Sequence, residues 1–148
     1  MTHSVEPLTL EDVAVATRLT QTFASEANHP AAGNPEATAK FLATHLETDH
    51  AFGYKLVRDG VVTGIIFGIF GSDWLSGEKL AQELVWYVLP RERAGLDLMR
   101  YFEKEAARRG AKWVLSGFVP HFHGERMERV LTGIGFREIE KWWMKEIK

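Results

Sequence analysis

The sequence has 148 residues and contains no cysteine. Disulfide frameworks, thiolate zinc sites and cysteine nucleophiles are therefore excluded, and a reducing compartment fits. There is no large excess of one charge, because 18 Lys and Arg oppose 20 Asp and Glu. The net charge therefore provides no overall attraction to nucleic acid or an anionic membrane, and any anion-binding site must be local. An apolar run of about 18 residues and a signal-peptide pattern are also missing, so we expect a soluble, cytoplasmic protein.

The composition that remains is typical of a globular protein. Hydrophobic residues make up 45% of the chain and charged residues 26%. These fractions argue against disorder, coiled coils and collagen-like repeats. The length suits one domain with one core, so we expect a single domain over residues 1–148.

Hydrophobic periodicity and turn residues predict a mixed α/β layer architecture. Strands are expected over 4–8, 52–58, 61–70, 80–89 and 111–116, helices after Thr9, from Pro35, from Gly95 to Gly110 and over 125–132, and a last strand or hairpin over 136–147. The strongest local signal is Asp59–Gly60, which predicts a two-residue hairpin turn. The strand after it is apolar on both faces and should lie centrally in a covered sheet.

A local anion site is expected where the loop after Val88 leads into the long helix. Arg91 and Arg93 lie in this loop, and Ala94 and Gly95 are small enough for phosphates to approach. The first N–H groups of a helix have no intrahelical partner, and the helix dipole favours anions there. An ordinary solvated turn is the alternative interpretation of the same residues.

The order of several segments resembles the GCN5-related N-acetyltransferases over nearly the whole chain. The segments are LVRDGVVTG (56–64), QELVWYVLP (82–90), RAGL (93–96), LMRYFE (98–103) and the Gly135–Phe136 pair near the C-terminus. The resemblance implies a largely antiparallel central sheet with helices on both faces. It also implies that acetyl-CoA enters a V-shaped gap between the strands that end near Val88 and Phe118.

On this resemblance, the cofactor-binding residues are expected to be Tyr87, Val88, Arg91, Arg93, Ala94, Gly95 and Leu96. The family's loop pattern can be aligned with this sequence in two registers. In one, Arg91 is the first residue of the pattern, and in the other, the phase of the following helix fixes the alignment. We prefer the second, in which the loop before Gly95 is short and the arginine side chains replace some backbone contacts. The family's late-helix tyrosine, a general acid, is replaced by Leu131. Solvent, Tyr87, Tyr101, His121 or His123 would then supply the proton.

The resemblance places a general base at Glu83 and an oxyanion-binding N–H near Val88. Apolar neighbours should raise the pKa of a carboxylate at Glu83, which suits a base. The alternative is a Glu83 that faces solvent or pairs with an arginine.

The acceptor side is expected to include Trp74, Phe118, His121 and His123. His121, His123 and Glu125 have a spacing that could bring three ligands to one metal, but a solvated loop is the preferred interpretation and no metal is expected. Trp142 and Trp143 are adjacent and would face opposite sides of a strand, which a homodimer contact through this strand would cover.

The sequence therefore predicts an N-acetyltransferase that moves acetyl from acetyl-CoA to a primary amine, on a small molecule or a protein, by direct attack. A catalytically weak or inactive CoA-binding or protein-interaction module of the same fold is the alternative. A metal-dependent hydrolase using His121, His123 and Glu125 is the third hypothesis.

Overall fold

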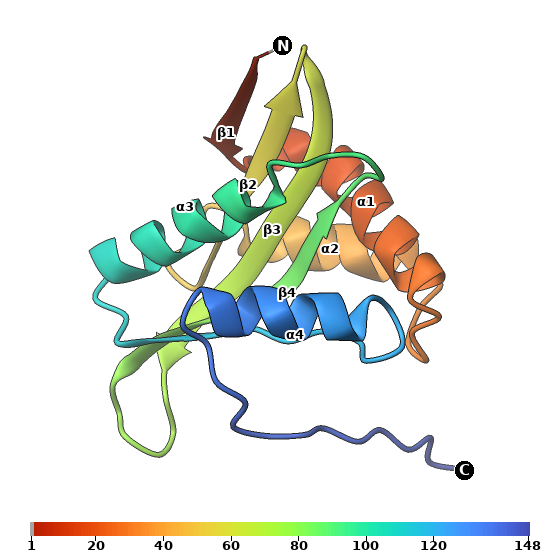
Figure 1. Cartoon of the computed structure of the whole chain (residues 1–148). Helices are drawn as coiled ribbons and strands as arrows, with labels where there is room; N and C mark the ends of the chain where they lie inside the picture. The colour runs from red at the N-terminus through yellow and green to blue at the C-terminus, as the bar shows by residue number, and fades with distance from the viewer. Residues whose placement is uncertain (1) are drawn as a thin grey trace. The chain divides into compact units, whose positions relative to one another are not determined.

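The computed structural model describes residues 2–148 (Figure 1). In chain order the elements are β1 (His3–Pro7), a 3-10 turn η1 (Leu10–Asp12), α1 (Val13–Glu26), α2 (Pro35–His45), β2 (Ala51–Arg58), β3 (Val61–Ser72), β4 (Lys79–Val88), α3 (Gly95–Arg108), β5 (Trp113–Leu115) and α4 (Gly124–Gly133). The chain divides into two compact units, one ending at Gly117 and the other running from Phe118 to Lys148. In residues 2–148, no helix is long and apolar enough to cross a membrane.

The first unit is a five-stranded sheet in the order β1-β2-β3-β4-β5. The first four strands pair antiparallel, and β5 joins β4 in parallel. Helices α1 and α2 cover one face, and α3 covers the other (Figure 1). The predicted mixed, largely antiparallel sheet with helices on both faces is therefore confirmed.

The β2–β3 hairpin turns at Asp59 and Gly60, as predicted. Both residues have positive φ, 50° and 79°, as a two-residue type I′ turn requires. The β3 strand that follows is central in the sheet. Its Ile65, Ile66 and Phe67 are almost fully buried, because helices lie on both sides of them.

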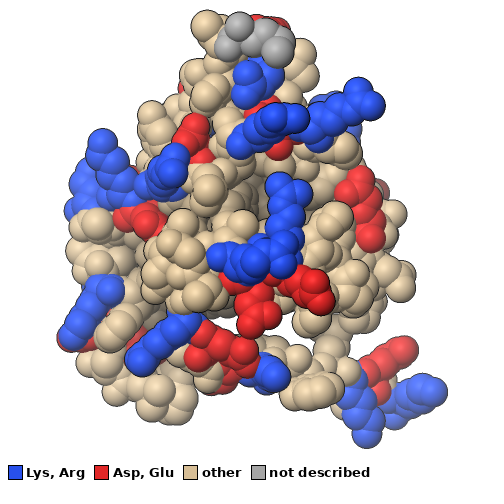
Figure 2. Space-filling model, viewed as in Figure 1, with Lys and Arg blue, Asp and Glu red and all other residues tan. Residues whose placement is uncertain are grey.

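Each face of the sheet has its own packed side chains. On the α1 and α2 face, the core includes Leu19, Leu42, Phe67 and Val85. Helix α3 buries the predicted apolar stripe Met99, Phe102 and Ala106, and Phe102 stacks on Phe52 with ring centroids 4.7 Å apart. Charged side chains of both signs are interspersed on the surface that Figure 2 shows, in agreement with the small net charge.

Gly68 on β3 provides a test of this packing. A Cβ at Gly68 would collide with the Gln82 carbonyl oxygen and lie 2.5 Å from Phe102 Cζ, whereas a Cβ at Gly71 on the same strand meets nothing within 4 Å. We expect Gly68→Ala to lower the free energy of unfolding by about 1–3 kcal/mol, because overpacking forces the sheet and α3 apart. Urea denaturation of Gly68→Ala and of the control variant Gly71→Ala checks this. Equal stability of Gly68→Ala and Gly71→Ala would contradict the close α3 packing.

The second unit, residues 118–148, contains α4 and a C-terminal stretch. Helix α4 agrees with the helix expected over 125–132. It ends at Gly133, and Gly135, with a φ of 100°, turns the chain after it while the Phe136 amide donates to the Leu131 carbonyl at 2.9 Å. The last strand or hairpin expected over 136–147 is wrong for this chain as described, because these residues form neither a helix nor a strand. A strand needs a hydrogen-bonded neighbour as well as a suitable composition.

Candidate active site

Strands β4 and β5 separate at Glu83. They pair only from Leu80–Trp113 to Gln82–Leu115, although β4 continues to Val88. At the same point β4 carries a bulge, because Val85 and Glu83 pair with the consecutive residues Phe67 and Gly68 of β3 and leave Leu84 without a partner there. A bulge bends its strand and increases its twist, which turns β4 away from β5. In the part of the chain that the structure describes, the edge of β4 beyond Glu83 thus has no strand neighbour on the β5 side.

The backbone of β4 offers a hydrogen-bond donor along this open edge. The Leu89 amide donates to the Thr63 carbonyl at 2.8 Å, so it points toward β3. Consecutive N–H groups of a strand point to opposite edges, and the Val88 N–H therefore points away from β3, into the opening. This is the position expected for a donor to a developing oxyanion.

The Glu83 carboxylate lies where the two strands part. Although part of the residue is accessible to solvent, desolvation by the surrounding protein is the largest effect on it and raises its pKa to about 8. The Gly117 amide and the nearby Ser116 hydroxyl act in the opposite direction. Ser116 Oγ is buried without a hydrogen bond of good geometry among the described residues, so its contact with Glu83 is weak. No arginine is paired with Glu83 in residues 2–148, and its raised pKa lets the carboxyl exchange a proton near pH 8.

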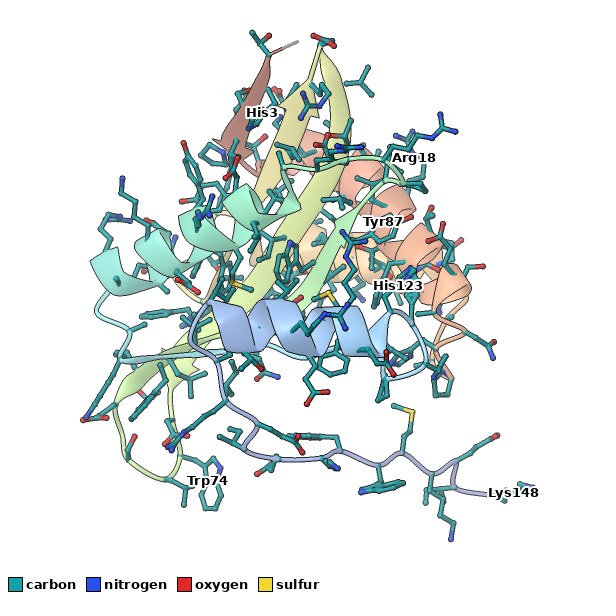
Figure 3. All side chains as sticks on the ribbon, viewed as in Figure 1. His3, Arg18, Trp74, Tyr87, His123 and Lys148 are labelled. Atoms are coloured by element: carbon teal, nitrogen blue, oxygen red, sulfur yellow. The ribbon has the colours of Figure 1, made fainter. Side chains whose placement is uncertain are left out.

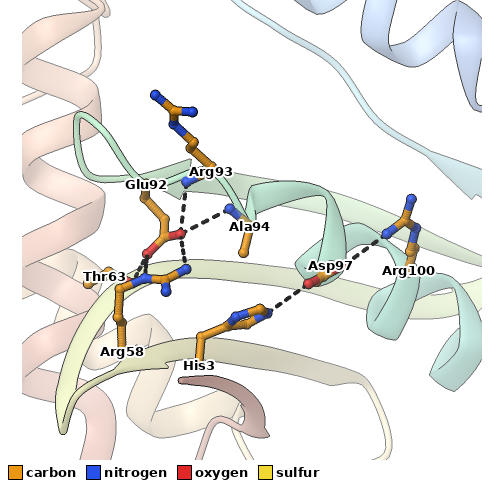
Figure 4. Close-up of polar contacts among 8 residues, drawn as sticks. All are labelled: His3, Arg58, Thr63, Glu92, Arg93, Ala94, Asp97 and Arg100. Atoms are coloured by element: carbon orange, nitrogen blue, oxygen red, sulfur yellow. Dashed lines mark hydrogen bonds and ion pairs between the residues drawn. The ribbon is translucent and has the colours of Figure 1, made fainter. Parts of the chain in front are cut away.

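The loop between β4 and α3 is organised by Glu92, which the sequence analysis did not single out (Figure 4). Its carboxylate accepts hydrogen bonds from Nε and Nη2 of Arg58 at 3.0 and 2.9 Å and from the Thr63 hydroxyl at 2.8 Å. It also accepts from the backbone amides of Arg93 and Ala94 at 2.8 and 2.9 Å. These bonds, chiefly that with Arg58, lower the pKa of Glu92 to about 2. Glu92 thus holds the end of β2, the start of β3 and the helix start together as a buried anion.

This arrangement limits how a diphosphate could bind at the start of α3. Since the Arg93 and Ala94 amides already donate to Glu92, their predicted role in cofactor binding would require the carboxylate to be displaced. The amides of Gly95 and Leu96 lie in the first turn of the helix, where no intrahelical partner exists. The side chains of Arg91 and Arg93 are exposed. The amides of Gly95 and Leu96 and the two guanidinium groups are therefore the donors that remain for a diphosphate, and binding by these residues stays a prediction.

Tyr87 lies on β4, but its side chain packs on the face of the sheet that α1 and α2 cover (Figure 3). Its hydroxyl donates to Glu26 at 3.0 Å, and burial together with Glu26 raises the pKa of Tyr87 to about 12. Its ring lies 6.1 Å from that of Phe23. The Tyr87 hydroxyl therefore anchors α1, and a high pKa makes it a weak acid for protonating a thiolate.

A groove of about 590 Å³ runs along α1 close to Glu26. Its lining residues are Ala14, Thr17, Arg18, Gln21, Thr22, Ser25, Glu26 and Pro35. Thr17 is 9% exposed and its hydroxyl has no hydrogen-bond partner among the described residues. The surface of the groove is mainly apolar, although hydroxyl, amide, guanidinium and carboxylate groups also line it. The sequence contained no signal for it beyond the helical spacing of these residues.

The residues expected on the acceptor side are divided between the two units. Trp74 is in the β3–β4 loop and 88% exposed (Figure 3). Phe118, His121 and His123 lie in the second unit, where His123 adopts a φ of 56° just before α4 and stacks edge-on against Phe122. Their role in acceptor binding stays a prediction. Leu131 is buried, as an apolar residue on a helix commonly is.

Within residues 2–148, no three His, Cys, Asp or Glu side chains are grouped so that they could hold a metal ion. His121, His123 and Glu125, the ligands of the hydrolase hypothesis, do not form such a group.

No known protein family and no curated protein is matched by the sequence. Solved structures, however, are similar over almost the whole chain. A GCN5-related N-acetyltransferase from Ralstonia eutropha is 19% identical, with 98% of this chain and 99% of that chain covered and a TM-score of 0.78. This chain has the GCN5-related N-acetyltransferase fold.

Two further solved structures with this fold are aminoglycoside acetyltransferases. An aminoglycoside acetyltransferase from an uncultured soil sample is 17% identical, with both chains fully covered and a TM-score of 0.76. The aminoglycoside N-acetyltransferase AAC(6')-Iy, solved in complex with CoA, is 17% identical, with 99% of this chain and 95% of that chain covered and a TM-score of 0.76. At these identities, the similarity establishes the GCN5-related N-acetyltransferase fold.

Proposed function

We propose that this protein is an N-acetyltransferase that moves the acetyl group of acetyl-CoA to a primary amine by direct attack. The observation that carries the proposal is Glu83, a carboxylate with a pKa of about 8 at the point where β4 and β5 part. Acetyl-CoA supplies an activated acetyl thioester. Glu83 takes a proton from the substrate ammonium group, and the neutral amine then attacks the thioester carbonyl carbon while the Val88 N–H donates to the carbonyl oxygen. Collapse of the tetrahedral intermediate breaks the C–S bond, releases the CoA thiolate and loses the second amine proton to solvent. Solvent returns a proton to the thiolate, which is a good leaving group at a pKa of about 8.5.

The acceptor is proposed to be a small-molecule or protein amine. Structures of the same fold include aminoglycoside acetyltransferases and a ribosomal-protein-alanine N-acetyltransferase, so both kinds of amine belong in a screen. The absence of cysteine makes this screen simple, because thiol released from acetyl-CoA is detected against a protein that contributes no thiol of its own.

The second candidate, a weak CoA-binding module without transfer activity, is favoured by one observation. The Glu92 carboxylate accepts hydrogen bonds from the Arg93 and Ala94 amides, and it adds a negative charge beside the place proposed for a diphosphate. Calorimetric titration with acetyl-CoA, combined with thiol release over an amine panel, separates the two. Binding with amine-dependent thiol release supports the enzyme, whereas binding without release over the whole panel supports the module. No binding at millimolar acetyl-CoA contradicts both.

The two exposed arginines of the loop should contribute directly to cofactor affinity. We expect Arg91→Ala/Arg93→Ala to weaken CoA binding more than tenfold, since two cationic contacts to the diphosphate are removed. Arg100→Ala is the matched control, because Arg100 is exposed on α3 and pairs with Asp97 at 2.9 Å. Dephospho-CoA, which keeps the diphosphate, should lose affinity by the same factor. An unchanged affinity in the double variant would place the diphosphate elsewhere.

A further inference from the structure

Trp86 of β4 makes a contact with the start of α3 that the proposed mechanism does not use. Its indole Nε1–H donates a hydrogen bond to the backbone carbonyl oxygen of Gly95 at 3.0 Å. Tyr87 points to the face that α1 and α2 cover, and since side chains alternate along a strand, Trp86 and Val88 point to the α3 face. These residues all lie in the first unit, so the contact belongs to one compact part of the chain.

The indole hydrogen bond fixes more than the carbonyl group that accepts it. The Gly95 carbonyl and the Leu96 N–H belong to one planar peptide unit, in which the two groups point in opposite directions. A carbonyl held by the indole therefore sets the direction of the Leu96 N–H. This amide lies in the first turn of α3, where it has no partner within the helix. Trp86 thus orients one of the few backbone donors that remain at this helix start.

Contacts on both sides of this peptide unit support it further. A Cβ at Gly95 would lie 3.2 and 3.5 Å from the two methyl carbons of Val88, so the helix start packs directly on β4. On the loop side, the Glu92 carboxylate accepts hydrogen bonds from two backbone amides at 2.8 and 2.9 Å. Glu92 therefore holds the peptide units before the helix, and Trp86 holds one within its first turn.

We propose that Trp86 is a positioning residue for the diphosphate of acetyl-CoA and that it acts by aiming the Leu96 N–H at this group. The inference rests on the proposed acetyl transfer and adds a residue that acts through the backbone of α3. Because Glu92 already occupies two amides of the loop, each remaining donor carries a larger share of the binding. A hydrogen bond weakens steeply as its angle departs from linear, so the direction of this N–H matters.

Trp86→Phe tests this role, because phenylalanine keeps an aromatic ring against α3 but has no N–H donor. The KM for acetyl-CoA should rise about three- to tenfold, which is the effect of losing one well-aligned hydrogen bond. The turnover number at saturating acetyl-CoA and the KM for the amine should stay within about twofold of the wild type. Thiol release with each substrate varied in turn gives these values, and calorimetry with CoA gives the Kd directly.

Trp113→Phe is the matched control. The indole Nε1–H of Trp113 donates to the Glu78 carboxylate at 3.3 Å, so the same substitution removes one indole hydrogen bond away from α3. The KM of this variant for acetyl-CoA should equal that of the wild type. A purely structural effect of Trp86→Phe would lower the fraction of folded protein, and thereby the turnover number, without changing the KM.

Gly95→Ala disturbs the same contact without touching the indole ring. Its Cβ pushes the helix start away from Val88, so the KM for acetyl-CoA should rise, and the double variant with Trp86→Phe should show less than the product of the two single effects. An unchanged KM in folded Trp86→Phe, a fall in its turnover number alone, or fully multiplicative effects overturn the positioning role while wild-type transfer remains. A wild-type chain that neither binds CoA nor releases thiol overturns the proposed function itself, and this inference with it.

Discussion

Glu83→Gln is expected to lower the turnover number of amine acetylation by about 10²–10⁴-fold while leaving the affinity for acetyl-CoA within threefold. The glutamine keeps the size of the side chain but cannot accept the proton of the attacking amine. In the wild type, kcat/KM should rise with pH up to about 8, where Glu83 becomes ionised. The variant should lose this dependence. Thiol release measured from pH 6 to 9.5 gives both quantities.

The control for this change is Glu103→Gln on α3. Burial also raises the pKa of Glu103, but Glu103 is on a helix and not at the opening between β4 and β5. Its turnover should equal that of the wild type. Glu83→Gln should be at least as stable as the wild type. A carboxyl group whose pKa is raised in the folded chain lowers the free energy of unfolding as pH rises from about 4.5 to about 8, and the glutamine has no such effect. Full activity of Glu83→Gln at neutral pH would show that another group is the base.

Glu92→Ala is expected to lower the free energy of unfolding by about 3–5 kcal/mol. The substitution removes the acceptor of five hydrogen bonds and leaves Arg58 without its carboxylate partner. Urea denaturation followed by circular dichroism measures the change. Glu105→Ala, which removes an α3 carboxylate paired with exposed Arg108, is the comparison and should lose less than about 1 kcal/mol. Equal losses would contradict the structural role of Glu92.

The pH dependence of stability gives a second test of the role of Glu92. The pKa of Glu92 is about 2 in the folded chain, against 4.5 for an ordinary glutamate, so its contribution to stability is present above pH 4.5 and is lost as pH falls toward 2. The shift corresponds to roughly 3 kcal/mol. Glu92→Gln should flatten this part of the acid denaturation curve. An unchanged acid transition would mean that other carboxylates dominate it.

The sequence was informative where the pattern is local. The turn at Asp59–Gly60, the apolar stripe of α3 and the burial of β3 each follow from residues close in the chain, and the structure confirms them. The position of Glu83 on β4 was likewise predicted. Glu92 was missed, because its significance depends on Arg58, 34 residues earlier in the chain.

Tyr87 is a second residue whose role depends on a partner far away in the sequence. The family resemblance places Tyr87 among the expected cofactor-binding residues, but its hydroxyl donates to Glu26, 61 residues away, on the opposite face from α3. Alternation along a strand determines that neighbours face opposite sides. Which side faces the site depends on the bulge at Leu84, which appears only when β3 and β4 are paired.

The sequence by itself therefore determined the order of the elements, the cysteine-free chemistry and the presence of a carboxylate on the strand before α3. The tertiary structure decided that β4 and β5 part at this carboxylate and that the helix start already holds an internal anion. The physical reason is the range of the interactions. Periodicity and turn preference act over a few residues, whereas desolvation, ion pairing and strand pairing depend on groups that only the fold brings together.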